Sequence, residues 1–212
     1  MPTASPPTQC TVRNARTAVL VMTAILLSAA ARGANAQAAV SAKALTPDLQ
    51  TARAGLEKYQ DPIAAVRDGY YSTVACIDFP KGATDGDIVY PPGAMGVHFL
   101  NPGNIGPKLD PAKPQVLIYE QVKDKLKLVA AEWFVPVEAA GTERPQIFGQ
   151  QLSGPMDGHE PIMPATLRHY DLHVWLWKNN PRGVFTSTNA AVKCPESGYP
   201  VSLPSGMPGM KH

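Results

Sequence analysis

The chain has 212 residues, of which 44% are hydrophobic and 17% are charged. This apolar content is enough for one packed domain, and it excludes a chain that stays disordered because it has too little to bury. The net charge of +2 at pH 7 argues against a nucleic-acid-binding protein, which would carry a clear excess of Lys and Arg. The 22 prolines and 17 glycines favour few helices and many loops.

The first 36 residues have the pattern of a cleaved secretory signal peptide. Arg13 and Arg16 precede an apolar run over residues 17–31, and an Ala-Asn-Ala sequence ending at Ala36 follows. The run is shorter than the ~20 residues that a membrane-spanning helix needs, which favours a signal over a membrane anchor. We therefore expect a periplasmic or secreted protein with no integral membrane segment once the signal is removed, carrying 16 basic and 17 acidic side chains.

Removal of the signal would leave two cysteines, Cys76 and Cys194. In an oxidising compartment, two thiols most simply form one disulfide. The alternative is a pair of soft metal ligands, which is less favoured because neither cysteine lies in a Cys-x-x-Cys spacing.

A helical N-terminal segment is predicted over residues 37–69. Thr46-Pro47-Asp48 is typical of a helix start, with a capping hydroxyl, a first-turn proline and an acid near the positive end of the helix dipole. Asp61-Pro62 repeats this signal, and Asp68-Gly69 indicates the end of the second helix. We expect a helix, a break and a short helix, packed on one surface by a narrow apolar stripe.

Residues 70–195 are predicted to form the β-rich core of the same single domain. Short runs with Val, Ile, Tyr, Phe and Trp alternate there with loops of Gly, Pro, Asn and Asp. The expected strands are Tyr71–Phe79, Met95–Leu100, Gln115–Glu120, Lys125–Val135, Gln146–Phe148 and Tyr170–Lys178.

No second helix cluster follows these strands, which argues against parallel βαβ winding. The predicted fold class is therefore α+β, with the N-terminal helices packed on a curved, mainly antiparallel β-sheet. The Gly- and Pro-rich segment 149–168 is expected to be loop, and residues 196–212 a flexible tail.

The stretch from His169 to Trp177 carries most of the candidate site. A period of two separates it into one face with His169, Asp171, His173, Trp175 and Trp177 and a second with Tyr170, Leu172, Val174 and Leu176. Two imidazoles, a carboxylate and two indoles in one row fit neither a solvated face nor a dry core. A pocket or groove satisfies both constraints, and Asp171 and His173 are close enough on one face to reach a common ligand.

The same stretch has a helical alternative. On a helix, His169 and His173 would lie one turn apart, which is a common zinc geometry. On a strand the two residues are ~13 Å apart and cannot share one ion directly. The Val-Trp-Leu-Trp continuation favours the strand, so no His169/His173 chelate is predicted.

Other candidate ligands come from separate segments. His98 lies on an expected strand, His159 lies in a Gly- and Pro-rich loop, and Glu132 adds a carboxylate to an otherwise apolar strand. The sequence nominates His98, His159 and His173 as metal ligands, and Asp171, His173, Trp175 and Glu132 as the lining of a ligand pocket. The implied cofactor is a Zn or Cu ion, because imidazoles suit these borderline metals. Each histidine also has a purely structural explanation, as a hydrogen-bonded strand residue or an exposed loop residue.

Methionines beside histidines suggest a softer site. Met156, His159 and Met163 lie in one loop, and Met207, Met210 and His212 lie near the C-terminus. Thioethers with imidazole favour Cu(I), whereas the C-terminal group is also typical of a floppy tail.

Three functional hypotheses remain open from the sequence. The first is a metal or small-ligand binding protein with a pocket lined by His, Asp and Trp. The second is a structural or envelope-interaction domain whose histidines satisfy loops. The third is a secreted enzyme with His173 as general base and Asp171 or Glu132 setting its pKa. Hydrolase and nucleotide-binding motifs such as Gly-x-Ser-x-Gly and Gly-x-Gly-x-x-Gly are absent from the sequence.

Three motifs resemble a group of bacterial exported proteins of unknown function. They are Met95-Gly96-Val97-His98-Phe99-Leu100-Asn101-Pro102, the stretch His169–Trp177, and Asn179-Asn180-Pro181-Arg182-Gly183-Val184-Phe185. The resemblance covers most of residues 70–195 and implies a single exported bacterial domain. It implies no activity.

Overall fold

The computed structural model of the chain describes residues 45–159 and 163–195. The predicted signal peptide at 1–36 and the tail at 196–212, with Met207, Met210 and His212, lie outside the described residues. None of the helices in the described part of the chain has the length and hydropathy that a membrane span requires.

The N-terminal helices follow the predicted order of helix, break and helix. They are α2 (Pro47–Leu56), the 3₁₀ turn η1 (Glu57–Gln60) and α3 (Pro62–Arg67). The Thr46 hydroxyl accepts a hydrogen bond from the backbone N–H of Leu49, and the Asp61 carboxylate accepts one from Ile63. These caps satisfy N–H groups that the first turn of a helix leaves without partners.

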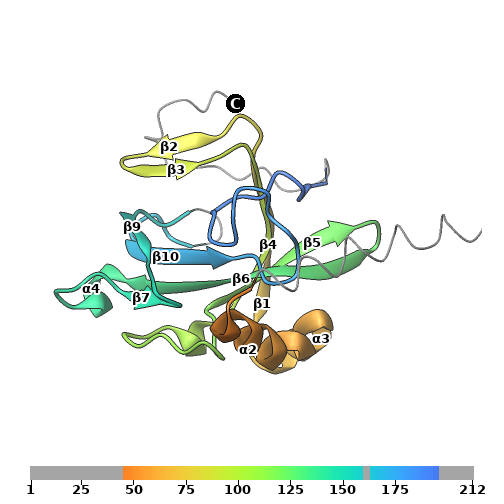
Figure 1. The fold of residues 1–212 in the computed structure, drawn as a ribbon, viewed down its shortest axis with the longest axis horizontal. Helices are drawn as coiled ribbons and strands as arrows, with labels where there is room; N and C mark the ends of the chain where they lie inside the picture. The colour runs from red at the N-terminus through yellow and green to blue at the C-terminus, as the bar shows by residue number, and fades with distance from the viewer. Residues whose placement is uncertain (1–44, 160–162, 196–212) are drawn as a thin grey trace, which may run out of the picture. The chain divides into compact units, whose positions relative to one another are not determined.

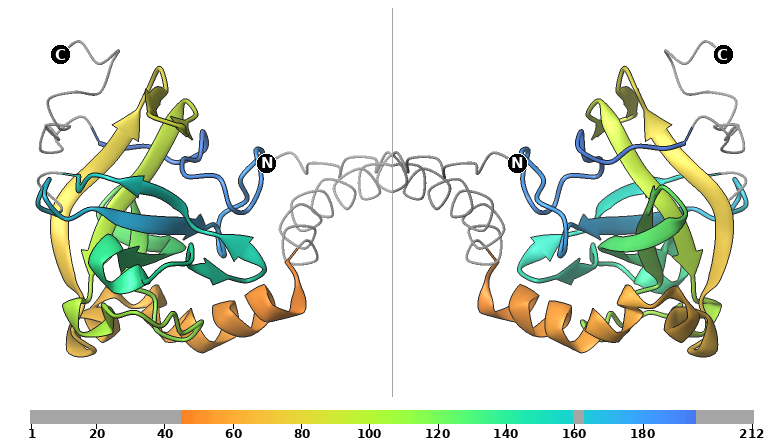
Figure 2. Two further views of the ribbon diagram at one scale, coloured as in Figure 1. Left: turned by 90° about the vertical axis from the view of Figure 1, so that its left-hand side faces the viewer. Right: turned by 90° about the vertical axis from the view of Figure 1, so that its right-hand side faces the viewer.

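A curled, antiparallel six-stranded sheet forms the core of the fold (Figures 1 and 2). Its strands, in spatial order, are β1 (Tyr71–Phe79), β4 (Gly93–Leu100), β5 (Val116–Val122), β6 (Lys125–Pro136), β10 (His169–Val174) and β9 (Ser153–Met156). The α+β fold class with N-terminal helices and a curved antiparallel sheet is therefore confirmed.

Smaller elements lie outside this sheet. Two hairpins are formed by β2 (Ala83–Asp85) with β3 (Ile88–Tyr90) and by β7 (Gln146–Ile147) with β8 (Gln150–Gln151). The 3₁₀ turn η2 (Pro102–Asn104) follows β4, and the short helix α4 (Val137–Ala140) follows β6.

The two faces of the sheet pack against different partners. The face that we call the helix face contributes alternate residues such as Phe99, Leu117, Trp133 and Leu172 to the largest apolar cluster, which also contains Leu49, Leu56, Tyr59 and Ala65 of the helical segment. The opposite face, which we call the site face, carries His98, Glu132 and His173 beside a second apolar cluster with Ile118 and Phe134. Alternation along each strand thus separates core packing from candidate chemistry.

The segment after β10, residues 175–194, crosses the site face. Trp175 donates its backbone N–H to Val184, and Asn189 exchanges two backbone hydrogen bonds with Ala94 of β4. Trp175 and Val192 of this segment join the apolar cluster of the site face. The predicted disulfide is present between Cys76 of β1 and Cys194, and it fixes the end of the segment to the edge of the sheet.

Two predictions for the chain after residue 148 are wrong. The segment 149–168 is more than a loop, because β8 and β9 lie in it and β9 pairs with β10 at the sheet edge. The last strand ends at Val174 rather than Lys178, since the backbone N–H of Trp175 donates to Val184 and the regular ladder with β6 is interrupted there. Beyond this point, Trp177 and Lys178 donate their backbone N–H groups to the one carbonyl of Val129 on β6.

The early end of β10 removes Trp177 from the predicted row. Its indole N–H donates to the Glu57 carboxylate at 2.8 Å, and its ring packs against the cluster of the helix face. The Trp177 indole therefore does not line the site face. The β2–β3 hairpin was also not predicted, because its strands are only three residues long.

Candidate metal centre

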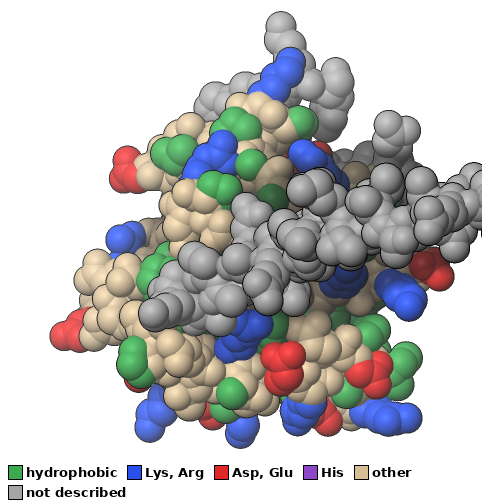
Figure 3. Space-filling view, turned by 45° about the vertical axis from the view of Figure 1, so that its right-hand side comes forward, with side chains coloured by type: hydrophobic (Ala, Val, Ile, Leu, Met, Phe, Trp, Pro, Cys, Tyr) green, Lys and Arg blue, Asp and Glu red, His purple; other side chains and the backbone are tan. Residues whose placement is uncertain are grey.

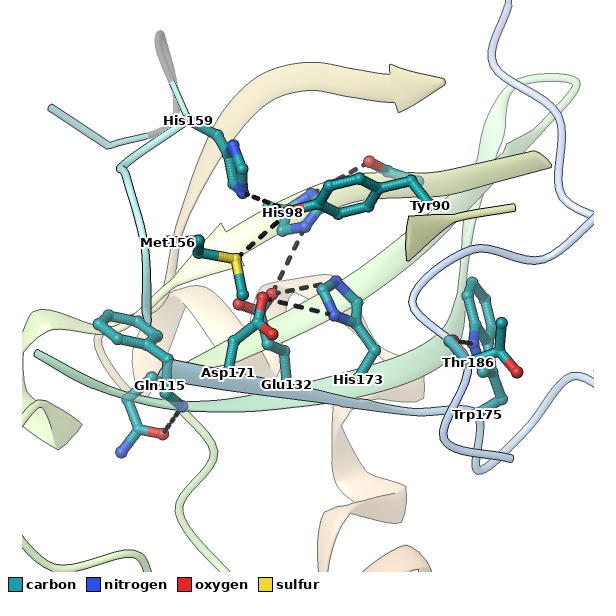
Figure 4. A network of polar contacts seen from close by, with 12 residues as sticks. Tyr90, His98, Gln115, Glu132, Met156, His159, Asp171, His173, Trp175 and Thr186 are labelled. Atoms are coloured by element: carbon teal, nitrogen blue, oxygen red, sulfur yellow. Dashed lines mark hydrogen bonds and ion pairs between the residues drawn. The ribbon is translucent and has the colours of Figure 1, made fainter. Parts of the chain in front are cut away.

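Three strands of the site face bring His98, Glu132 and His173 together. His98 lies on β4, Glu132 lies on β6, and His173 lies directly opposite Glu132 on β10. The Nε2 atoms of both histidines are 3.5 Å from the same carboxylate oxygen, Oε2 of Glu132 (Figure 4). The three ligand atoms lie within 4.8 Å of one another, so the group can hold a metal ion.

The curl of the sheet makes this approach possible. In a flat sheet, β4 and β10 would be three strand spacings apart, about 14 Å. The ring centroids of His98 and His173 are instead 6.1 Å apart, with the rings nearly perpendicular. The side chains converge because the sheet curves around the site face, and this curvature is not encoded in the spacing of any one strand.

The backbone of its own strand orients His98. Its Nδ1 lies 3.1 Å from the carbonyl oxygen of Gly96, which fixes the proton on Nδ1 and leaves the lone pair of Nε2 facing Glu132. Gly96 has φ of +111°, and a Cβ there would lie 2.7 Å from the carbonyl oxygen of Tyr119. Only glycine fits this position, so the sequence of β4 is adapted to hold the His98 ring in place.

His173 lacks the hydrogen bonds that a structural histidine normally makes. It is only 3% exposed, and neither of its ring nitrogens has a hydrogen-bond partner among the described residues. Nδ1 lies 3.8 Å from Oδ2 of Asp171, which is too long for a hydrogen bond but places a carboxylate behind the ring. A buried polar group left without a partner costs about 1–3 kcal/mol, and this cost calls for an explanation.

The buried groups of the site are held in their neutral forms. Burial lowers the pKa of His98 to about 4 and lowers that of His173 well below its usual range. Burial also raises the pKa of Glu132 well above its usual range, with the nearby Asp171 adding to the effect. Neutral imidazoles are the form that binds a metal, and no positively charged side chain of the described residues faces the Glu132 carboxyl.

Asp171 lies on the same face of β10 as His173. Burial raises the pKa of the Asp171 carboxyl to about 7. Carboxylates that stand behind a histidine ligand orient its ring and raise its basicity. The position of Asp171 beside Nδ1 of His173 suits that role, with Nε2 directed at Glu132 (Figure 4).

A pocket of about 300 Å³ reaches the site. His173 and Asp171 form part of its wall, together with Tyr90 of β3, Arg144, and Phe185 and Ser187 of the segment after β10. A small molecule in this pocket would therefore contact the side of His173 that faces away from the helix face.

The remaining predicted residues lie at other places. His159 is buried but is not part of the His98, Glu132 and His173 group, and its Nε2 lies 3.5 Å from the Tyr90 hydroxyl. The Trp175 indole donates to the backbone carbonyl of Thr186 at 2.6 Å and is directed away from the histidines (Figure 4). The sequence placed Glu132 in the ligand pocket rather than among the metal ligands, whereas the structure places its carboxylate between the two imidazoles.

Burial is common to all histidines in the described residues. None of them is visible on the face of the molecule shown in Figure 3, and each is at most 5% exposed. Tyr90 is not among the predicted site residues, because a lone tyrosine before two prolines carries no spacing signal. The only cue to Glu132 as a ligand was a charged residue in an apolar strand.

Comparisons with known proteins add no relative to these observations. No family model, curated protein or solved structure matches the chain.

Proposed function

We propose that this chain is an exported protein that binds one divalent transition-metal ion through Nε2 of His98, Oε2 of Glu132 and Nε2 of His173. The single observation that carries the proposal is the convergence of three buried ligand atoms within 4.8 Å of one another. A divalent cation would displace the proton of the buried Glu132 carboxyl and compensate the resulting charge. It would also give His173 Nε2 a partner, which the described residues do not supply.

The ligand chemistry favours a borderline metal. Two imidazoles and one carboxylate form a three-ligand set of the kind that leaves a further coordination position open on Zn²⁺. Cu²⁺ suits the same nitrogen and oxygen donors and binds most N/O sites more tightly than Zn²⁺. We therefore expect the site to accept both ions, with the higher affinity for Cu²⁺.

The pocket beside His173 supports a second ligand at the ion. Tyr90 and Phe185 are among the residues that line the pocket, and Asp171 provides a polar group near the proposed ion. A small molecule with an apolar body and one atom able to coordinate the ion would fit such a pocket. The alternative of a structural domain explains His98 well, but it leaves both nitrogens of His173 without a role.

Titration with Zn²⁺ tests the metal proposal. We expect the untagged, chelator-treated chain to bind one equivalent in a calorimeter, and Glu132→Gln to weaken binding by more than about 100-fold. Asp171→Asn should weaken it by about 10–100-fold, as expected for a partner behind a ligand. The matched control is Glu120→Gln, which replaces a buried carboxylate that is paired with Lys178 away from the site. Equal zinc binding by Glu132→Gln and wild type would refute the ligand set.

Export is supported by the disulfide between Cys76 and Cys194, since such bonds persist in oxidising compartments. The mass of the chain recovered from the periplasm or medium of an expressing bacterium tests this part. We expect the loss of about 36 N-terminal residues. Recovery of an uncleaved chain from the cytoplasm alone would contradict export.

A further inference from the structure

A second group of buried donors lies on the same side of the sheet and is not used by the proposed centre. It consists of Met156 at the end of β9, His159 in the loop that follows, and His169 at the start of β10. All three side chains are at most 5% exposed. The His159 and His169 rings are 5.8 Å apart at right angles, and the Tyr90 hydroxyl lies 3.4 Å from Sδ of Met156 and 3.5 Å from Nε2 of His159.

The hydrogen bonding of this group is incomplete. Nδ1 of His169 lies 3.1 Å from the backbone carbonyl of Leu167 and so carries the proton, which leaves the lone pair of Nε2 without a partner in the described part of the chain. Nδ1 of His159 also has no partner among the described residues, and its Nε2 has only the long contact with Tyr90. Two imidazoles with unused nitrogens in a dry setting are costly unless something binds them.

We infer that Met156, His159 and His169 form a second metal site, selective for Cu(I). A thioether with two neutral imidazoles is a soft donor set, and Cu(I) accepts it without the charged ligand that a divalent ion prefers. In the described residues, no carboxylate completes a metal-binding group with these histidines. The Met side chain is flexible enough to turn its sulfur toward an ion between the two rings.

An acidic pocket lies beside Met156 of this group. A pocket of about 320 Å³ between the β2–β3 hairpin and β9 has Met156 in its wall. Asp85, Asp87 and Asp157 line the same pocket, opposed by one cation, Arg168, which is paired with Asp157. The excess of carboxylates favours entry of a positive ion.

The inference is independent of the first centre, and its test keeps the two apart. The untagged chain is first loaded with Zn²⁺ and then titrated without oxygen with Cu(I) held by a coloured competing chelator. We expect one equivalent of Cu(I) to bind, the zinc to stay bound, and X-ray absorption at the copper edge to show sulfur and imidazole neighbours.

Matched methionine variants give the decisive comparison. Met156→Leu should lower the Cu(I) affinity at least 10-fold and remove the sulfur neighbour, while Met95→Leu, at a methionine buried to the same degree in an apolar cluster, should change neither. His169→Gln serves as the second variant if Met156→Leu fails to retain zinc, and it should also lower the affinity for Cu(I).

Three results would overturn the inference. They are the absence of Cu(I) binding to the zinc-loaded chain, displacement of zinc by copper, and a sulfur neighbour that survives in Met156→Leu. The last result would place the ion on another thioether, either that of Met163 in the same loop or those of Met207 and Met210 near the C-terminus. Loss of zinc binding in the wild type would instead count against the proposed function alone.

Discussion

The two faces of the sheet are both buried, yet they are built from different chemistry. The helix face is covered by α2, η1 and α3 and packs Leu, Tyr, Trp and Phe side chains into one cluster. The site face carries a carboxylic acid pair and several imidazoles, and burial shifts the pKa of most of these groups toward the neutral form. The difference teaches that burial alone does not identify a core. Burial of the apolar side chains stabilises the fold, whereas burial of the imidazoles and carboxyl groups on the site face costs free energy.

The disulfide connects the two faces, and its removal should have the largest effect. Cys76 belongs to the cluster of the helix face, and Cys194 contacts the clusters of both faces. The bond closes a loop of 118 residues, so the chain-entropy model gives a stabilisation of ~4–5 kcal/mol. We expect Cys76→Ala with Cys194→Ala to lose this amount in denaturant unfolding. A loss below about 1 kcal/mol would show that the unfolded chain is not constrained by the bond.

Two adjacent residues of β10 sharpen the comparison. Leu172 faces the helix face, and His173 faces the site face. Leu172→Ala should cost about 2–5 kcal/mol of unfolding free energy because it leaves a cavity in packed apolar side chains. His173→Ala should cost the metal-free protein much less, since the His173 ring makes no hydrogen bond to the described residues, while it removes zinc binding. Chemical unfolding gives the loss of unfolding free energy for each variant, and calorimetric titration gives its zinc binding. A larger loss of stability in His173→Ala than in Leu172→Ala, with zinc binding retained, would contradict the assignment of the two faces.

Zinc should stabilise the folded chain only by binding to the ligands on the site face. At a free zinc concentration of about 100 times Kd, linkage adds about 2.7 kcal/mol, which raises Tm by roughly 5–10 °C for a domain of this size. Leu172→Ala should show the same rise from a lower starting Tm, whereas Glu132→Gln should show almost none. Thermal unfolding with and without zinc gives the answer, and a full zinc response in Glu132→Gln would contradict the account.

The pH dependence of the metal-free protein should show the cost of the buried carboxyl. Because burial raises the pKa of Glu132, the folded chain keeps a proton that the unfolded chain releases above pH ~4.5. Stability therefore falls as pH rises through this range, by up to about 1.4 kcal/mol per pH unit for this one group.

Glu132→Gln lacks this loss, so its stability relative to wild type should increase from pH 5 to pH 7. The neighbouring titratable groups, His98, Asp171 and His173, are present in both proteins and cancel to first order in the difference. Denaturant unfolding at several pH values measures the difference in unfolding free energy between Glu132→Gln and wild type. A difference that stays constant with pH would show that Glu132 ionises normally in the folded chain.

The sequence predicted most of the sheet because strand patterns are local. The alternation of apolar residues placed β1 at its observed bounds and found β4, β5 and β6 within a few residues. It failed at the end of β10, where Trp175 and Trp177 continue the pattern but the backbone N–H of Trp175 donates to Val184. Val184, the competing hydrogen-bond partner, lies nine residues later in the chain, and the two-residue alternation of side chains along a strand gives no information about it.

The candidate site was only partly predictable for a similar reason. The periodic row identified Asp171 and His173 as neighbours on one face, and His98 and Glu132 were noted as polar residues on strands. Their convergence depends on sheet curvature and on the order β4–β5–β6–β10, which are properties of the whole fold. Tyr90 had no signal at all, because it reaches Met156 and His159 from a hairpin that the sequence did not predict.

Crystals of the untagged chain grown with Zn²⁺ give the most direct test of the central claim. Anomalous diffraction measured on both sides of the zinc absorption edge should place one peak between Nε2 of His98, Oε2 of Glu132 and Nε2 of His173, at about 2.0–2.2 Å from each. Electron density for a water molecule at that point without an anomalous peak, with zinc found only at surface carboxylates, would contradict it.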